Sequence, residues 1–314
     1  MPSPFIFKDK FRSALWGFIV GDALGVPFEF CTREEMQQNA ATGIVGYGTH
    51  GQPPGTWSDD TSMMLCVMEN IFEGKKSANL AKLFVKWYDE GYHTAHGEVF
   101  DIGITTREAI ENIKAGVHLS EVGSMDDYSA GNGSLMRSVP YAFVEDISQS
   151  ILRSNFEGFL THRLSICSTS TFLFIKNLRY LAEGLSKEEA LQRAGGYLRH
   201  GWRITDVELS EDFVKNFRRL FSKDFHKLPE NEIKSGGYVI HSLEAAIWSF
   251  MNSSTYEETV LKAVNLGGDT DTIAALSGAL AGAYYGIEQI PTHWMEQIAR
   301  KDELAAQINL WLAE

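Results

Sequence analysis

Apolar residues recur at helical spacing along most of this chain, and that periodicity limits the folds open to it. Side chains that return every three or four positions lie on one face of an α-helix, whereas a strand requires strict alternation. Few runs of β-branched residues compete with this pattern, so we predict an all-α fold. The segments with helical periodicity are residues 10–24, 61–73, 78–89, 104–115, 157–182, 187–199, 209–221, 237–251, 256–264, 272–286 and 293–312.

One of these helices is expected to be buried on every side. Residues 273–287 contain no charged side chain, yet they fall short of the roughly 20 apolar residues that span a bilayer. Their Ala and Gly residues would let a neighbouring helix approach closely. We therefore predict a central helix here and no membrane span.

Three other segments are predicted to interrupt the helices. Residues 42–56 are rich in Gly and Pro, and residues 123–134 carry similar turn-forming residues, so both are expected to be structured loops. Residues 200–236 are polar and mixed in charge, which indicates a peripheral excursion of helix and loop.

The composition fits one compact domain over residues 1–314. With 44% of its 314 residues hydrophobic, the chain can build a sizeable core. A net charge of −13 argues against a basic face for nucleic acid or an acidic membrane, but leaves small anionic ligands open. Three cysteines without close spacing indicate neither a disulfide framework nor a zinc motif, and no secretion signal is visible. We expect a cytoplasmic monomer.

Two short acidic clusters lie about 210 residues apart, SDDT at residues 58–61 and DTDT at residues 269–272. Each follows a Gly-rich turn and precedes an apolar helical segment. Their oxygen ligands are carboxylates and hydroxyls, without Cys or His nearby, which suits Mg²⁺, Mn²⁺ or Ca²⁺ better than Zn²⁺. Helix capping is the structural alternative, because Ser and Asp are common N-cap residues. Capping needs one side-chain oxygen per helix, however, whereas each cluster carries two mutually repelling carboxylates. The pair of clusters therefore favours a two-metal site.

A Gly-rich motif, GNGSLMR at residues 131–137, lies between the clusters. Its glycines would let backbone N–H groups approach an anion, and Ser134 adds a hydroxyl. An ordinary turn ahead of a helix is the alternative, since short Gly motifs are weak signals. Arg137 is a candidate partner for a phosphate or for an acidic side chain.

Four further residues are ambiguous when each is considered alone. They are one acid after a turn, a second acid, one imidazole and one aromatic ring: Glu29, Asp101, His162 and Tyr238. Each residue type is more often structural than functional at a single position. Only a shared framework would assign them to a site.

That framework comes from the order of the motifs, which resembles the ADP-ribosylglycohydrolase family. The resemblance covers residues 11 to 300, about the extent of the predicted core. It rests on GDALGVPFE, GTWSDDT, DIGITT, GNGSLMR, the TH pair at 161–162, SGGYVIHSLEAAIWSF and NLGGDTDTIAALSGALAGAYYG. Members of this family share a compact all-α fold with a central two-metal site, and they remove ADP-ribose from modified side chains or related conjugates.

The resemblance also implies roles for individual residues. Glu29 would lie near the reacting ribose, Asp101 would face the guanidinium of an arginine substrate, and Tyr238 would lie near adenine or ribose. The implied phosphate or ligand contacts are Gly131, Asn132, Gly133, Ser134 and His162. The implied metal ligands are Ser58, where many relatives have Thr, with Asp59, Asp60, Asp269, Asp271 and Thr272.

The resulting hypothesis is hydrolysis of the bond between ADP-ribose and a modified side chain, with arginine as the preferred side chain. Two divalent cations, Mg²⁺ or Mn²⁺, are the expected cofactors. Asp60 or Asp271 would accept the proton of the attacking water, and Glu29 would act as acid, base or orienter. The expected partner is an ADP-ribosylated protein or a small ADP-ribose conjugate, rather than nucleic acid.

Three alternatives remain open from the sequence. The substrate linkage could be serine, another oxygen linkage or nucleic acid in place of arginine. A silent ADP-ribose-binding or crystallin-like protein would retain the fold without the activity. A metal-dependent phosphohydrolase would use the same oxygen ligands for a different displacement.

Overall fold

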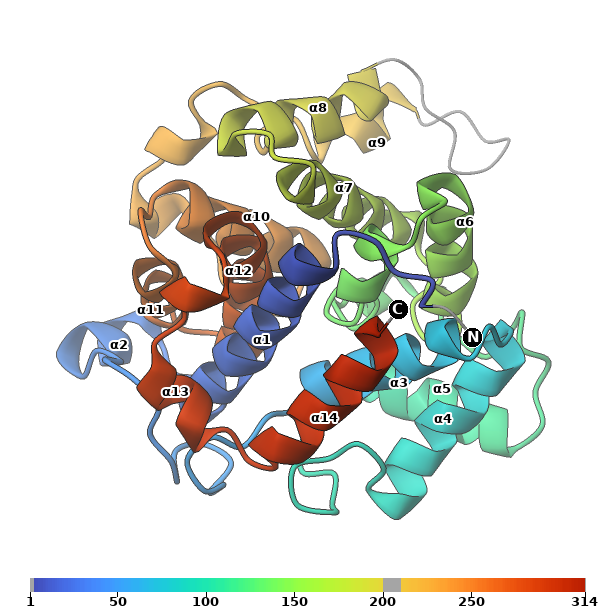
Figure 1. Ribbon diagram of the computed structural model, residues 1–314. Coiled ribbons are helices and arrows are strands. Elements are labelled where there is room, and N and C mark those ends of the chain that lie inside the picture. Colours follow the sequence, from blue (N-terminus) through green and yellow to red (C-terminus); the bar gives the residue numbers. More distant parts are fainter. Residues whose placement is uncertain (1–2, 200–209, 314) are drawn as a thin grey trace.

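The computed structural model describes residues 3–199 and 210–313, which form a set of packed helices (Figure 1). Within these ranges no β-strand forms, and β-pairing is limited to three isolated bridges. The predicted all-α fold is confirmed. The α-helices are α1 (Lys8–Gly25), α2 (Arg33–Gln38), α3 (Asp59–Phe72), α4 (Ser77–Glu90), α5 (Ile104–Lys114), α6 (Ile147–Gly158), α7 (Ser165–Ala182), α8 (Lys187–Arg199), α9 (Glu211–Lys215), α10 (Val239–Met251), α11 (Tyr256–Val264), α12 (Thr270–Tyr285), α13 (Thr292–Gln297) and α14 (Lys301–Leu312).

Helices α1 and α12 pack against each other at the centre of the fold. Small residues make the contact close: a Cβ atom added at Gly17 would lie 2.2 Å from the carbonyl oxygen of Gly278, and one added at Gly21 would lie 2.2 Å from that of Ala274. Every residue of α12 from Thr270 to Ala283 is buried. The prediction of a buried helix with a close neighbour is therefore confirmed.

The α1–α12 contact also positions the second acidic cluster. A Cβ atom added at Gly25, the last residue of α1, would lie 2.4 Å from the Cα atom of Asp271. The hydroxyl of Thr270 donates to the Gly25 carbonyl oxygen over 2.8 Å. The start of α12 is thus held against the segment that leads from α1 to Glu29.

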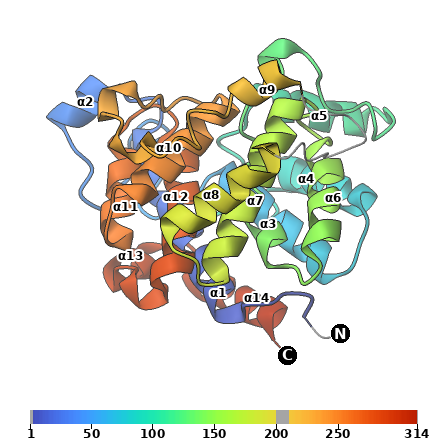
Figure 2. The same cartoon turned by 90° about the horizontal axis from the view of Figure 1, so that it is seen from above.

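The other helices surround this central pair. Helices α3, α4, α5 and α6 lie on one side of α1, and α10 and α11 lie on the other, as both views show (Figure 1, Figure 2). Helix α7 packs on α8 and α10. None of the helices in the described ranges combines the length and the apolarity that a membrane span requires.

The helix boundaries differ from the sequence prediction in two places. The segment predicted as one helix at 157–182 is divided, because α6 ends at Gly158 and α7 begins at Ser165. The segment at 293–312 is also divided, because Arg300 adopts a left-handed conformation with a φ of 49° between α13 and α14.

Other segments follow the prediction more closely. Residues 42–56 contain no helix, and residues 123–134 contain only a 3-10 turn at Asp127–Ser129, so both predicted loops are confirmed. The helix predicted at 209–221 is shorter, since α9 covers Glu211–Lys215, and residues 200–209 lie outside the described ranges. Helix α2 and most of α6 were not predicted.

Candidate active site

A cavity of about 330 Å³ opens where α3, α5 and α12 begin. It takes residues from segments that are far apart in the chain, including both acidic clusters and the Gly-rich turn. Its lining residues are Glu29, Phe30, Asp59, Asp60, Asp101, Ile102, Gly103, Ile104, Thr105, Thr106, Gly131, Asn132, Gly133, Met136, His162, Gly237, Asp269, Asp271 and Thr272. Most of the residues singled out from the sequence therefore line one cavity.

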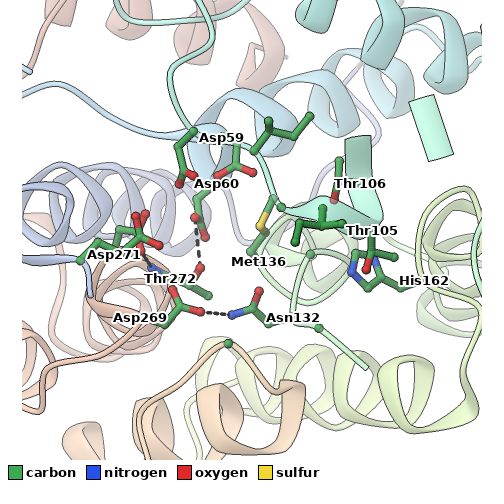
Figure 3. A pocket seen from close by; sticks show the side chains of 18 of the residues that line it. Asp59, Asp60, Thr105, Thr106, Asn132, Met136, His162, Asp269, Asp271 and Thr272 are labelled. Carbon is green, nitrogen blue, oxygen red and sulfur yellow. Dashed lines mark hydrogen bonds between the residues drawn. The ribbon is translucent and has the colours of Figure 1, made fainter. Parts of the chain in front are cut away.

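The two acidic clusters meet in this cavity. The hydroxyl of Thr272, in α12, donates to Oδ2 of Asp60, in α3, over 3.1 Å. The hydroxyl of Ser58 lies 3.1 Å from the same carboxylate oxygen. Figure 3 shows Asp59 and Asp60 facing Asp269, Asp271 and Thr272, with His162 farther along the cavity.

Helix capping does not account for the carboxylates of the first cluster. The Ser58 hydroxyl caps α3 by accepting a hydrogen bond from the backbone N–H of Asp60 over 3.2 Å. The carboxylates of Asp59 and Asp60 are thus free of that role, although both are buried. Within the described residues, Oδ1 of Asp60 has no hydrogen-bond partner. A buried carboxylate oxygen without a donor is costly unless another group neutralises it.

Asp22 is a further buried carboxylate that sequence reasoning missed. It lies in α1 and accepts hydrogen bonds from the backbone N–H groups of Ser58 and Thr61, at 3.0 Å each, and from the Thr61 hydroxyl over 2.5 Å. It therefore fixes the first turn of α3 from behind. An acid within an otherwise apolar helical segment was the available signal.

The electrostatic environment of the cavity is strongly acidic. Burial raises the pKa values of Asp59, Asp60 and Asp271 well above the ordinary value, and neighbouring carboxylates raise them further. Burial also raises the pKa of Glu29 to about 7. No Lys or Arg is among the cavity-lining residues in the described part of the chain. The acids therefore repel one another unless protons or a bound cation compensate them.

This donor set fits a hard divalent cation. One ligand oxygen from each of Glu29, Asp269 and Asp271 lies within 4.8 Å of the others, and the unpartnered Oδ1 of Asp60 belongs to the same cavity. Carboxylates and hydroxyls are the ligands that Mg²⁺, Mn²⁺ and Ca²⁺ accept. The acidic clusters can thus form a metal site.

The Gly-rich turn is joined directly to the second cluster. The Asn132 amide donates to Oδ2 of Asp269 over 2.6 Å and to the Ser242 hydroxyl over 2.8 Å. A Cβ atom added at Gly133 would lie 2.5 Å from Cε1 of His162. The turn therefore needs glycine where the imidazole packs against it.

His162 is neutral and oriented by its neighbours. Its burial, together with nearby Arg137, lowers its pKa to about 3. Arg137 donates to the Thr161 hydroxyl oxygen over 2.9 Å, and that hydroxyl lies 2.8 Å from Nδ1 of His162. The Thr161 hydroxyl therefore links Arg137 to the imidazole and orients the ring. Arg137 also donates to the Gly133 carbonyl oxygen, so it supports the site from outside the cavity.

Three of the residues predicted for the site are not among the cavity-lining residues. Ser58 lies next to Asp60 as described. The buried Ser134 hydroxyl lies 3.4 Å from that of Thr171. Tyr238 precedes α10, directly after the lining residue Gly237, and packs its half-exposed ring on His241, with a centroid distance of 4.9 Å.

Glu29 and Asp101 both line the cavity, and their carboxylates lie close to a residue that sequence analysis did not single out. His50 Nε2 is hydrogen-bonded to Oε2 of Glu29. One ligand atom from each of Glu29, His50 and Asp101 lies within 4.8 Å of the others. Burial raises the pKa of Asp101, and proximity to His50 opposes that rise.

Comparisons with known proteins agree with this arrangement. The ADP-ribosylglycohydrolase family model matches residues 4–314. The ADP-ribosylarginine hydrolase Tri1 of Serratia proteamaculans is 33% identical over 304 residues, which cover 95% of this chain and 77% of that protein. The ADP-ribosyl-[dinitrogen reductase] glycohydrolase of Rhodospirillum rubrum is 25% identical over 320 residues, which cover 97% and 96% of the two chains.

A solved structure, described as an ADP-ribosylglycohydrolase-related protein complex, matches with a TM-score of 0.79 and 30% identity, covering 98% of each chain. Its likeness extends over the whole helical arrangement and not only over the acidic clusters. Together with the family model, this match confirms the resemblance inferred from the motifs. The chain belongs to the ADP-ribosylglycohydrolase family.

Proposed function

We propose that this protein hydrolyses the glycosidic bond between ADP-ribose and an arginine side chain and releases ADP-ribose. The observation that carries the proposal is the convergence of both acidic clusters in one cavity beside Asp101. Asp59, Asp60, Asp271 and Thr272 line this cavity together with the Gly-rich turn. Arginine is favoured because relatives that are 33% identical over most of this chain are named ADP-ribosylarginine hydrolases.

Two divalent cations, Mg²⁺ or Mn²⁺, are proposed to be held by Ser58, Asp59, Asp60, Asp269, Asp271 and Thr272. When bound, they would supply Lewis-acid activation of a water molecule. The chain's own groups hold the ligands in place: the Thr272 hydroxyl bonds Asp60, and the Asn132 amide bonds Asp269. Asp60 or Asp271 would accept the proton of the attacking water.

Asp101 is proposed to recognise the leaving group. A guanidinium is planar and permanently charged, and a carboxylate can accept two of its N–H groups at once. Asp101 lines the same cavity as Glu29, and one carboxylate oxygen from each residue lies within 4.8 Å of the other. Glu29 is therefore well placed to act as an acid, base or orienter beside the bond that breaks.

The Gly-rich turn and His162 are proposed to bind the rest of ADP-ribose. Backbone N–H groups of a Gly-rich turn favour phosphate oxygens, and the neutral His162 lines the same cavity. Ser134 and Tyr238 are assigned to the same ligand in this proposal, because each is adjacent in the chain to a lining residue, Gly133 and Gly237 respectively.

We also propose that residues 1–314 form a single domain that acts as a monomer in the cytoplasm on ADP-ribosylated proteins or small ADP-ribose conjugates. The three cysteines are free in the structure, which suits a reducing compartment. The net charge of −13 disfavours nucleic acid as the carrier of the modification.

The test is the identity of the released product from two substrates. Arginine-modified and serine-modified proteins, each carrying labelled ADP-ribose, would be incubated with the enzyme and Mg²⁺ or Mn²⁺. The proposal predicts intact ADP-ribose, released faster from arginine. Faster release from serine would contradict the assigned linkage, AMP or inorganic phosphate would indicate a phosphohydrolase, and binding without release would indicate a silent ADP-ribose-binding protein.

A further inference from the structure

The loop before α3 is built to bring one imidazole against Glu29. Thr49 N–H donates to the Pro27 carbonyl oxygen over 3.0 Å, and the Thr49 hydroxyl donates to the Glu29 carbonyl oxygen over 2.6 Å. Two hydrogen bonds from Thr49 therefore join the loop to the segment after α1, one at Pro27 and one at Glu29 itself. His50 is the next residue in the loop.

Glycine permits this close approach. A Cβ atom added at Gly48 would lie 1.8 Å from the Pro27 carbonyl oxygen, which no side chain could tolerate without moving the loop. Gly51 has a φ of 64° and closes the turn through a 3.0 Å hydrogen bond from its N–H to the Gly48 carbonyl oxygen. The sequence GTHG at residues 48–51 thus fixes where the imidazole lies.

The backbone on both sides of the contact is strained. Phe30, directly after Glu29, and Tyr47, before the turn, each have a φ of 65°. Non-glycine residues in this region carry a conformational cost that the surrounding contacts must offset, and such residues gather at functional sites. The strained residues bracket the Glu29–His50 pair.

The imidazole contacts Glu29 but is not among the cavity-lining residues. The His50 side chain is 12% exposed and that of Glu29 is 8% exposed. The His50 ring also packs near Phe100, with a centroid distance of 5.3 Å, which limits its rotation. Hydrogen bonds to a charged group are stronger than neutral ones, so this contact restrains the Glu29 carboxylate effectively.

Until a cation binds, Glu29 needs such a restraint because its other carboxylate neighbours repel it. Asp269 and Asp271 each have a ligand oxygen within 4.8 Å of one on Glu29. A glutamate side chain has several rotatable bonds, and like charges would turn its carboxylate away from the cavity. His50 is the imidazole that directly opposes that movement.

We propose that His50 is a positioning residue that holds the Glu29 carboxylate in the orientation from which it acts in the hydrolysis proposed above. The proposal rests on that hydrolase function and extends it to a residue outside the cavity lining. His50 does not contact the substrate in this account. It acts only through Glu29.

The kinetic test is a double-mutant cycle between the two residues. His50→Ala should lower kcat for ADP-ribosylarginine by about 10- to 100-fold, as removal of a supporting hydrogen-bond partner does elsewhere, with KM changed less than about threefold. In a Glu29→Ala background the same substitution should cost less than about twofold, because no carboxylate remains to be positioned. His50→Gln should recover part of kcat, since its amide can also donate.

A matched control removes an imidazole that contacts the same loop from the segment between α4 and α5, without contacting Glu29. His96 Nε2 lies 2.8 Å from the Thr56 hydroxyl, and the His96 side chain is exposed. His96→Ala should retain kcat within about twofold. Equal losses from His50→Ala in the wild-type and Glu29→Ala backgrounds would indicate only a loop anchor and would overturn the proposal.

A second measurement decides the pairing even if the wild-type protein releases no ADP-ribose. Absence of ADP-ribose release would contradict the proposed function but would leave the pairing untested by kinetics. Histidine ring-nitrogen NMR does not depend on turnover, because it reports the Glu29–His50 contact directly. The His50 Nε2 resonance, assigned by its loss in His50→Gln, should move in Glu29→Ala. An unchanged resonance would overturn the positioning role.

Discussion

The Thr272 hydroxyl donates to Oδ2 of Asp60 over 3.1 Å, although the two residues are 212 positions apart in the chain. Each residue lies in the first turn of its helix, Asp60 in α3 and Thr272 in α12. This hydrogen bond joins the two acidic clusters into one site before any cation binds. The proposed metal site depends on that junction.

Replacing the central carboxylates should remove activity without unfolding the protein. Asp60→Asn combined with Asp271→Asn should lower ADP-ribose release by more than about 1,000-fold, the scale seen when groups that act as a unit are removed. The fold should persist, because buried amides do not repel one another as carboxylates do. Circular dichroism measured beside turnover would separate the two effects.

The control for this double variant is Asp302→Asn, since Asp302 is exposed in the first turn of α14. It should keep full turnover. Near-normal turnover of the Asp60→Asn, Asp271→Asn protein would contradict the catalytic roles assigned to these two residues.

Without metal, the protein should lose stability as the pH rises. Burial raises the pKa of Asp22 from 3.8 to about 6 and that of Glu29 from 4.5 to about 7. A carboxyl with a raised folded-state pKa favours folding while protonated, so this contribution is present below pH 4 and is lost between about pH 4 and 7. For Asp22 alone, about two pKa units correspond to a free energy of about 3 kcal/mol.

Thermal unfolding in the presence of chelator measures this effect. The Tm should fall by several degrees between pH 5 and pH 8. Added Mg²⁺ or Mn²⁺ should raise the Tm more at pH 8 than at pH 5, because ionised carboxylates bind the cation. A metal-free Tm that is constant or higher at pH 8 would contradict the buried acidic cluster.

The close contact of α1 with α12 predicts that Gly21→Ala destabilises the fold. The added Cβ atom would meet the Ala274 carbonyl oxygen at 2.2 Å, which would force the two helices apart. Overpacking of this kind costs about 1–3 kcal/mol of unfolding free energy. Urea denaturation would measure that cost.

Gly196→Ala is the matched control, because Gly196 is also helical but a Cβ atom there would meet nothing within 4 Å. That substitution should stabilise the protein by about 0.5–1 kcal/mol, through helix propensity alone. Equal effects of the two substitutions would argue against a tight α1–α12 contact.

The role assigned to Asp101 predicts a change in linkage preference. Asp101→Ala should reduce hydrolysis of arginine conjugates at least about tenfold more than that of serine conjugates, because only arginine presents a guanidinium to the carboxylate. The two rates should be measured with the same enzyme preparation. Equal losses on both substrates would remove the argument for guanidinium recognition.

The sequence predicted the fold class and much of the site because both depend on local patterns. Helical periodicity marked the main helices, and the order of the motifs identified the family, which the family model and the relatives confirm. The ligand chemistry of the two acidic clusters predicted that they share one site, and they lie together in the structure. The individual roles of these residues stay predictions.

The parts that were missed depend on contacts between distant segments. Asp22 appears in the sequence as one acid in an apolar helix, and its bonds to Ser58 and Thr61 exist only after α1 and α3 pack together. His50 lies in a loop whose position depends on Gly48 approaching Pro27. Periodicity also continued through residues 159–164, where the turn that carries His162 divides α6 from α7.

The central claim is that the joined acidic clusters form a metal-dependent hydrolytic centre. The most direct measurement is release of ADP-ribose from arginine-modified protein with Mg²⁺ or Mn²⁺, then with chelator, and then with the cation restored. The account predicts release that chelator stops and restored cation recovers. Release that continues at the same rate in chelator would contradict it.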